Sequence, residues 1–155
     1  MRFWFDTEFY EDGRTIELIS IGVVAEDGRT YYAETIDAIP LCHKSFWLKD
    51  NVLPHLDHHH TKSREEIAQD MVLFCGDKPK LWAYYADYDW VVLCQIFGTM
   101  MHLPKGWPMY CRDVKQLCDD LGNPELPPQP TQEHHALADA MWTKQAWNFL
   151  QGLKK

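Results

Sequence analysis

Residues 2–10 read RFWFDTEFY, and the rest of the chain can be arranged around this stretch. Apolar side chains fall on both faces of it, with Phe3, Phe5 and Phe9 on one and Trp4 and Tyr10 on the other. Period-two alternation predicts a β-strand, and apolar groups on both faces predict a central one. Asp6 and Glu8 interrupt this pattern. Because they are two residues apart, they point to the same face.

Two carboxylates on a central strand require a reason to be there. Carboxylates are rarely buried unless they are paired or bind a metal. An edge strand with one solvated face would also accept Asp6 and Glu8, but the aromatic residues on both sides argue against an edge. The stretch therefore predicts that these two acids hold a cation.

The segments that follow predict an antiparallel meander. EDGR at 11–14 leads into TIELISIGVVAE, a β-branched run, and EDGR at 26–29 leads into TYYAET at 30–35. Short Asp-Gly turns between such runs are typical of hairpins. Three antiparallel strands are expected over the first 35 residues.

From about residue 45 the apolar spacing changes to three and four, which indicates helices. Helices are expected at 45–53, 63–76, 89–98, 112–121 and 135–150, with a strand at 80–86 and a short one near 109–111. This order predicts an α/β fold with a mixed five-stranded sheet, a three-strand meander and flanking helices. The length of 155 residues fits a single domain spanning 1–155.

Composition narrows the class of protein. No run of about 18 apolar residues exists, and acids appear before any stretch that could serve as a signal peptide. The five cysteines form no CxxC pair, so neither a disulfide framework nor a thiolate zinc site is expected. A cytoplasmic protein with no membrane association is predicted. The net charge of −8 argues against coating long nucleic acids, which requires a basic surface.

A third acid follows the strand at 80–86. In YYADYDWVVL, Asp87 and Asp89 are both candidates. An acid at the start of a helix is well suited to accept backbone N–H bonds as N-cap. We therefore expect Asp87 to cap the helix and Asp89 to join the acids of the first strand.

The fourth acid lies in EHHALADA at 133–140. Asp139 falls in the first turn of the last predicted helix, where an acid is also common because of the helix dipole. His134 precedes it by five residues in the loop, and His135 by four. A single histidine is more often structural, so spacing alone does not choose between them.

Together these segments resemble the three motifs of the DEDDh 3′→5′ exonucleases. FDTE, the YD of YADYD and HHALAD match Asp-x-Glu, aromatic-Asp and His-x4-Asp in the family's order. DTEFYEDGRTIELISIGVVAEDGR, YDWVVLCQIFG and the Pro-rich approach to HHALADA are most similar to the RNase AS group of exoribonucleases. The resemblance implies an RNase H-like fold, two Mg²⁺ ions, a homodimer and a preference for adenylate. It selects His134 over His135.

The resemblance assigns each residue a role. Asp6, Glu8, Asp89 and Asp139 would bind two Mg²⁺ ions, which Mn²⁺ could replace, and His134 would act as general base. The substrate would be the 3′ end of single-stranded RNA, which would release nucleoside 5′-monophosphates. Phe9 and Tyr10, beside Glu8, are candidates for stacking on the terminal base.

Other functions remain open from the sequence. The motifs do not distinguish an RNA enzyme from a DNA exonuclease or a general oligoribonuclease. A non-catalytic binding module would not need four mutually repelling acids. The His58–His60 run could bind Ni²⁺ or Zn²⁺, but a metal-storage function would depend on that run alone.

Overall fold

The computed structural model describes residues 1–129, 131 and 133–154. Within them a six-stranded sheet has the order β4-β3-β2-β1-β5-β6. Its strands are β1 (Arg2–Glu11), β2 (Ile16–Ala25), β3 (Thr30–Thr35), β4 (Thr61–Lys62), β5 (Lys80–Ala83) and β6 (Arg112–Asp113). The helices are α1 (Ala38–Cys42), α2 (Phe46–Asn51), α3 (Arg64–Cys75), α4 (Asp87–Phe97), α5 (Val114–Asp120) and α6 (Ala136–Leu153). Two 3₁₀ turns, η1 (Leu53–His55) and η2 (Met100–His102), complete the described elements.

The sheet confirms the predicted α/β class and corrects its strand count. β1, β2 and β3 form the expected antiparallel meander, and β5 and β6 extend it in parallel beside β1. The prediction of five strands is wrong because β4 pairs with the end of β3. Two residues are too short to produce a periodic signal. The strand expected near 109–111 lies at Arg112–Asp113.

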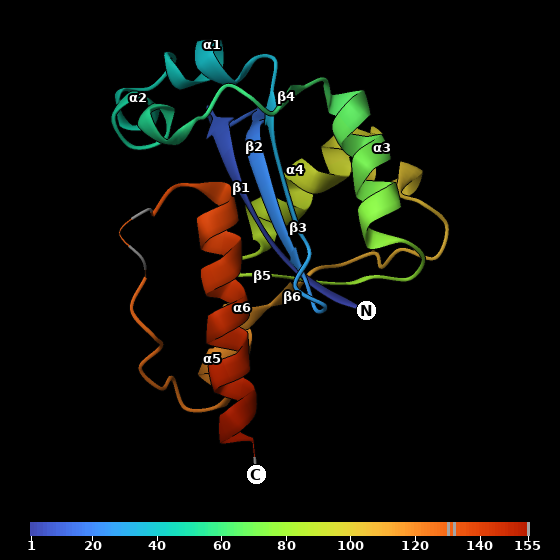
Figure 1. Ribbon diagram of the computed structural model, residues 1–155, viewed down its shortest axis with the longest axis vertical. Helices are drawn as coiled ribbons and strands as arrows, with labels where there is room; N and C mark the ends of the chain where they lie inside the picture. Colours follow the sequence, from blue (N-terminus) through green and yellow to red (C-terminus); the bar gives the residue numbers. More distant parts are fainter. Residues whose placement is uncertain (130, 132, 155) are drawn as a thin grey trace.

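Helices cover both faces of the sheet, as Figure 1 shows with α6 on one side and α3 and α4 on the other. The alternation of β1 explains the two layers. Phe3 and Phe5 pack into the core beneath α3 and α4, whereas Trp4 packs with α5 and α6. α1 and α2 close the sheet at the end where β1 finishes, over a third cluster that includes Ile19.

The helices begin and end close to the expected positions, with one wrong cap. The N-cap of α4 is Ala86, and no side chain caps it, so the prediction that Asp87 caps this helix is wrong. Asp113 of β6 instead accepts bonds from the two amides just before α4. The five-residue α1 was missed. None of the described helices combines the length and apolarity needed to cross a membrane.

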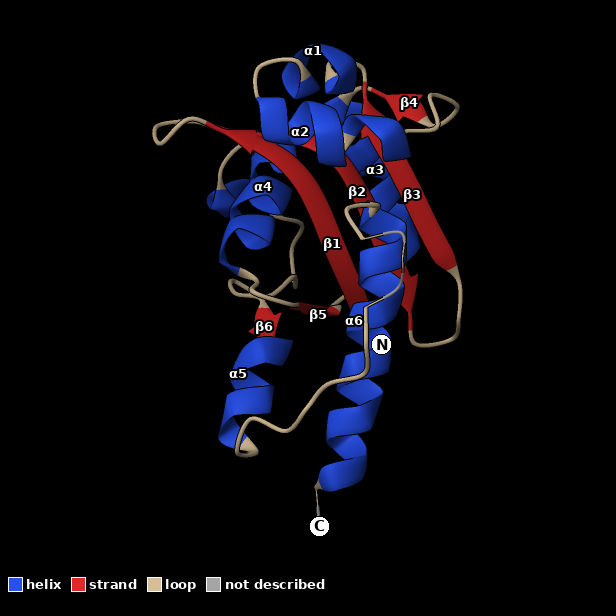
Figure 2. Cartoon of the chain, turned by 90° about the vertical axis from the view of Figure 1, so that its left-hand side faces the viewer, coloured by secondary structure: helices blue, strands red, loops and turns tan. Residues whose placement is uncertain are grey.

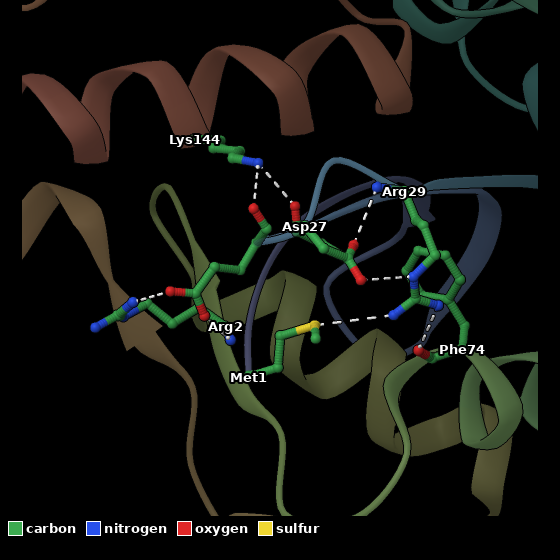
Figure 3. Close-up of polar contacts among 8 residues, drawn as sticks. Met1, Arg2, Asp27, Arg29, Phe74 and Lys144 are labelled. Carbon is green, nitrogen blue, oxygen red and sulfur yellow. Dashed lines mark hydrogen bonds and ion pairs between the residues drawn. The ribbon is translucent and has the colours of Figure 1, made fainter.

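A polar cluster joins the elements where β1 begins (Figure 3). From α6, Lys144 donates to the carbonyl oxygen of Glu26, whose side chain forms an ion pair with Arg2. Arg29 reaches the carbonyl oxygen of Phe74 at the end of α3. These bonds tie the helices of both layers to the turn between β2 and β3.

Candidate active site

The acids of β1 lie where the sheet loses a neighbour. β5 pairs with β1 only from Arg2 to Trp4, so the edge of β1 is free of strand partners on that side from Asp6 onward. Asp6 and Glu8 point to the face covered by α6, as the alternation predicts. Glu8 is buried, and Asp6 is partly exposed to a cavity.

Asp89 of α4 occupies the freed edge. Its Oδ1 accepts a bond from the backbone N of Thr7 at 2.9 Å and from the Thr7 hydroxyl at 2.5 Å. One carboxylate oxygen thus satisfies a backbone amide that a longer β5 would otherwise have paired. Thr7 thereby holds Asp89 beside Asp6, so Asp89 joins the acids of β1 as expected.

Asp139 and His134 reach the same place from the start of α6. The backbone N of His134 donates to Oδ2 of Asp139 at 2.8 Å, and His134 has a φ of 71°. This bond closes the loop tightly onto the first turn of the helix. It explains how a histidine outside the helix stays beside an acid five residues later.

The close approach of α6 to the sheet depends on Gly22. A Cβ at Gly22 would lie 2.3 Å from both Cα and N of Leu137, closer than any real contact. Gly22 pairs with Asp6 across the β1–β2 ladder. Because Gly22 places no side chain between the sheet and α6, the first turn of α6 lies directly on the sheet next to the β1 acids.

These groups line one cavity of about 530 Å³. Its lining includes all five predicted catalytic residues, Asp6, Glu8, Asp89, His134 and Asp139. It also includes Glu133, Thr7, and a set of aromatic residues, namely Phe9, Tyr84, Tyr85, Tyr88 and Trp142. Asp6 and Asp139, 133 residues apart in the sequence, therefore line a single acidic cavity with an aromatic wall.

The cavity is electrostatically unfavourable for carboxylates. Burial raises the pKa of Asp6 well above its usual value, and the charges of Asp89, Glu8 and Asp139 raise it further. Burial, followed by repulsion from Asp139 and Asp89, raises the pKa of Glu8 to about 9. Four converging acids of this kind favour either protonation or a bound cation.

Burial also raises the pKa of Asp89 and of Asp139, each to about 6. The bonds from Thr7 oppose the shift at Asp89, and the amide of His134 opposes it at Asp139. These donors are neutral, so they moderate the cost of the negative charge without removing it. Repulsion from Glu133 adds to the shift at Asp139.

The donor set fits a hard divalent cation. Oδ1 of Asp139 is buried, and it has no hydrogen-bond partner within the described part of the chain. Single ligand atoms of Glu8, His134 and Asp139 lie within 4.8 Å of one another. A buried carboxylate oxygen without a donor is a costly arrangement that a metal ion would relieve. Oxygen-rich ligands are those that Mg²⁺ and Mn²⁺ prefer.

The two adjacent histidines point to different environments. The ring of His134 meets the edge of Trp47 with centroids 4.8 Å apart, and it lines the acidic cavity. His135 is the N-cap of α6 and stacks on Tyr32 with centroids 4.6 Å apart. Only His134 is close to the acids, which agrees with the spacing of the motif.

The structure separates the two candidate stacking residues. Phe9 lines the cavity and packs against Tyr88, with ring centroids 5.7 Å apart. Tyr10 lies outside the cavity lining; it packs toward α1 and α2, beneath the ammonium group of Lys44. The Pro-rich approach at 126–130 borders the cavity through Gln129, while Pro130 lies outside the described residues.

Sequence reasoning missed several residues that build this site. An isolated glycine within a strand is a known sign of close backbone approach, so Gly22 could have been noticed. Thr7 and Trp47 carried no such signal, because their partners Asp89 and His134 are distant in the sequence. In the His58–His60 run, the backbone N of His58 donates to Glu34, and Nδ1 of His60 lies 2.8 Å from a carboxylate oxygen of Asp57. Metal binding by this run stays a prediction.

Comparison with known proteins identifies the family. Residues 1–151 match the family described as the 3′-5′ exoribonuclease Rv2179c-like domain. The chain is 46% identical over 147 residues to the 3′-5′ exoribonuclease Rv2179c of Mycobacterium tuberculosis strain H37Rv, covering 90% of this chain and 87% of that protein. It has the same identity and coverage against the 3′-5′ exoribonuclease MT2234.1 of strain CDC 1551. The chain therefore belongs to the 3′-5′ exoribonuclease Rv2179c-like family.

Proposed function

We propose that the protein is a metal-dependent 3′→5′ exoribonuclease of the DEDDh type. The observation that carries the proposal is the convergence of four acids with raised pKa values and His134 on one cavity. The names of the curated relatives support the same activity and direction. Hydrolysis would release nucleoside 5′-monophosphates one at a time from RNA 3′ ends.

The four acids would hold two divalent cations, Mg²⁺ or Mn²⁺. Such ions, when bound, supply positive charge that activates a water molecule and stabilises the leaving oxygen. Asp6, Glu8 and Asp139 would provide oxygen ligands from the sheet and from α6. Asp89 would contribute its Oδ2, because Thr7 occupies Oδ1 with two hydrogen bonds.

His134 would act as the general base. Its imidazole would take a proton from the attacking water as the new oxygen–phosphorus bond forms. The bond between phosphorus and the 3′ oxygen of the preceding nucleotide breaks, and that oxygen takes a proton from solvent, leaving a shortened RNA with a free 3′ hydroxyl. The ring is partly exposed, whereas its backbone is fixed to Asp139, so the group can meet substrate without losing its position.

The substrate would be single-stranded RNA with adenylate at its 3′ end. The resemblance to RNase AS supports the adenylate preference and a homodimer. With a net charge of −8, the protein is expected to grip the strand end locally and to show only a shallow dependence of affinity on salt. A contact to the 2′-hydroxyl would distinguish RNA from DNA, and Phe9 could stack on the terminal base.

One assay tests these statements. RNA and DNA oligomers labelled at the 5′ or the 3′ end are incubated with the protein in Mg²⁺ or in EDTA. We expect 5′-labelled RNA to shorten in single-nucleotide steps, oligo(A) faster than oligo(U), and DNA to persist. EDTA should stop the reaction, and Asp6→Asn should abolish it while the circular dichroism spectrum stays unchanged.

Each failure has a distinct meaning. Full activity in Asp6→Asn or in EDTA would refute the two-metal site. Equal rates on RNA and DNA would make the protein a general exonuclease and leave the catalytic residues unaffected. Binding of RNA without any cleavage would favour a non-catalytic module.

A further inference from the structure

Tyr85 has a backbone conformation that aromatic residues rarely adopt. It follows β5 and precedes α4 with a φ of 54°, in the left-handed region. Bulky residues are uncommon there, and such strained positions gather at functional sites. The side chain does not offset the cost by burial, because it remains 63% exposed.

Asp113 holds this turn in place. Its Oδ1 accepts the backbone N of Tyr85 at 3.1 Å, and its Oδ2 accepts that of Ala86 at 3.2 Å. The same carboxylate caps α5 through the backbone N of Lys115 at 2.7 Å. The Asp113 carboxylate thus joins the turn before α4 to the start of α5 through three backbone amides. These bonds fix the backbone of Tyr85 independently of its side chain.

The ring of Tyr85 extends an aromatic wall into the acidic cavity. It meets the ring of Tyr84 edge-on with centroids 4.6 Å apart, and Tyr84 meets Trp142 in the same way at 4.9 Å. All three line the cavity that also contains Asp89 and Asp139. Tyr85 is the exposed member of this wall, whereas Tyr84 is partly buried and Trp142 is buried.

We propose that Tyr85 stacks on an unpaired base of the RNA strand bound in the cavity. The inference rests on the proposed function, because it requires a nucleic acid strand whose phosphate reaches the acids. Stacking suits this site because the cavity lining that carries the acids contains no lysine or arginine among the described residues. An aromatic ring stacks on any base, and stacking requires no positively charged side chain. It can therefore provide affinity where phosphate contacts cannot.

The test separates stacking from structural support. Asn tolerates the left-handed conformation better than Tyr. Tyr85→Asn should therefore keep or raise the melting temperature while raising the KM for oligo(A) roughly tenfold and changing kcat less than twofold. Tyr85→Phe keeps the ring and should keep the KM. Tyr110→Asn, at an exposed tyrosine outside this cavity, is the matched control and should leave the KM unchanged.

A binding measurement gives a second readout. Anisotropy of fluorescent oligo(A) in the Asp6→Asn background should show the same roughly tenfold loss for Tyr85→Asn and none for Tyr85→Phe. A KM within twofold of wild type in Tyr85→Asn overturns the inference whatever its melting temperature. An equal rise in Tyr85→Phe overturns it too, because the ring is then not the group that acts. If wild type cleaves no RNA, the proposed function fails instead.

Discussion

At the scale of single residues, two neighbouring histidines differ in every contact. His134 lies in a strained loop against Trp47 and the acids, while His135 caps a helix and stacks on Tyr32. Burial lowers the pKa of His135, which favours its neutral ring. A neutral ring can accept the amide of Ala138, as a cap requires.

Substitution of each histidine should therefore affect a different property. His134→Ala should lower kcat by about 10²- to 10⁴-fold, the usual contribution of a general base, with little change in melting temperature. His135→Ala should cost about 1 kcal/mol of stability through the lost cap and leave kcat within a few-fold. His135→Asn, which restores a capping oxygen, is the control for stability. The reverse pattern of kcat would show that His135 is the base.

The sequence predicted much of the site at this scale because the deciding signals are local. Alternation along β1 is sufficient to bring Asp6 and Glu8 to one face. The position of Asp89 after the strand at 80–86 already assigned it to these acids, whereas the assignment of Asp139 required the family resemblance. Nothing local indicated that Thr7 would bond to Asp89, because that contact depends on where β5 ends.

At the scale of elements, Gly22 determines how closely α6 approaches the sheet. Gly22→Ala would place a Cβ 2.3 Å from the backbone of Leu137, so α6 must move outward and take Asp139 with it. We expect kcat to fall about 100-fold, since an ångström of misplacement is sufficient for that. Stability should fall by about 1–3 kcal/mol through overpacking.

Gly152, which lies in α6 itself, offers a control for Gly22→Ala. A Cβ at Gly152 would meet no atom within 4 Å. Gly152→Ala should therefore leave kcat unchanged and raise stability by about 0.5–1 kcal/mol. Equal activity of the two alanine variants would contradict the role given to Gly22.

The elements themselves were predictable in proportion to their length. β1, β2 and β3 have ten, ten and six residues, and their alternation and turns were sufficient. β4 and α1, with two and five residues, are stabilised by contacts that the sequence does not display locally. The cap of α4 was predicted wrongly because Asp113, which satisfies the amides before it, lies 26 residues beyond Asp87.

At the scale of the whole molecule, the acidic cavity links folding to pH. The raised pKa values of Glu8, Asp89 and Asp139 mean that the folded chain holds more protons than the unfolded chain. The contribution of these three groups to the stability of the fold is complete below the unfolded pKa of about 4. It is lost as pH rises through the folded pKa values of about 6 and about 9. His135, with its lowered pKa, acts in the opposite direction, but it is one group against several.

The melting temperature of the metal-free protein should consequently fall as pH rises from 5 to 8. Mg²⁺ should reverse most of that loss, because a cation offsets the same charges. Differential scanning fluorimetry in EDTA and in Mg²⁺ measures both effects. Glu8→Gln, which removes the group with the pKa of about 9, should flatten the metal-free profile. A metal-free melting temperature that rises steadily to pH 8 would contradict this account.

The assembly of the molecule is open to a direct measurement. The resemblance to RNase AS predicts a homodimer, so light scattering should give twice the chain mass of 18.3 kDa. α2 exposes two large apolar side chains, Phe46 at 88% and Trp47 at 52%, and Trp47 contacts His134 of the cavity lining. A mass near 18.3 kDa at micromolar concentration would refute the homodimer.

The junction of β1 with α6 affects how the protein is made. Of the described elements, β1 leaves the ribosome before all others and α6 after them, as their colours at opposite ends of the scale in Figure 1 indicate. Figure 2 shows the two elements side by side. A nascent chain without α6 lacks Asp139, and the backbone of His134 then lacks the carboxylate that fixes it. The proposed nuclease would thus be inactive during its own translation, while the mRNA that encodes it is still close to the nascent chain.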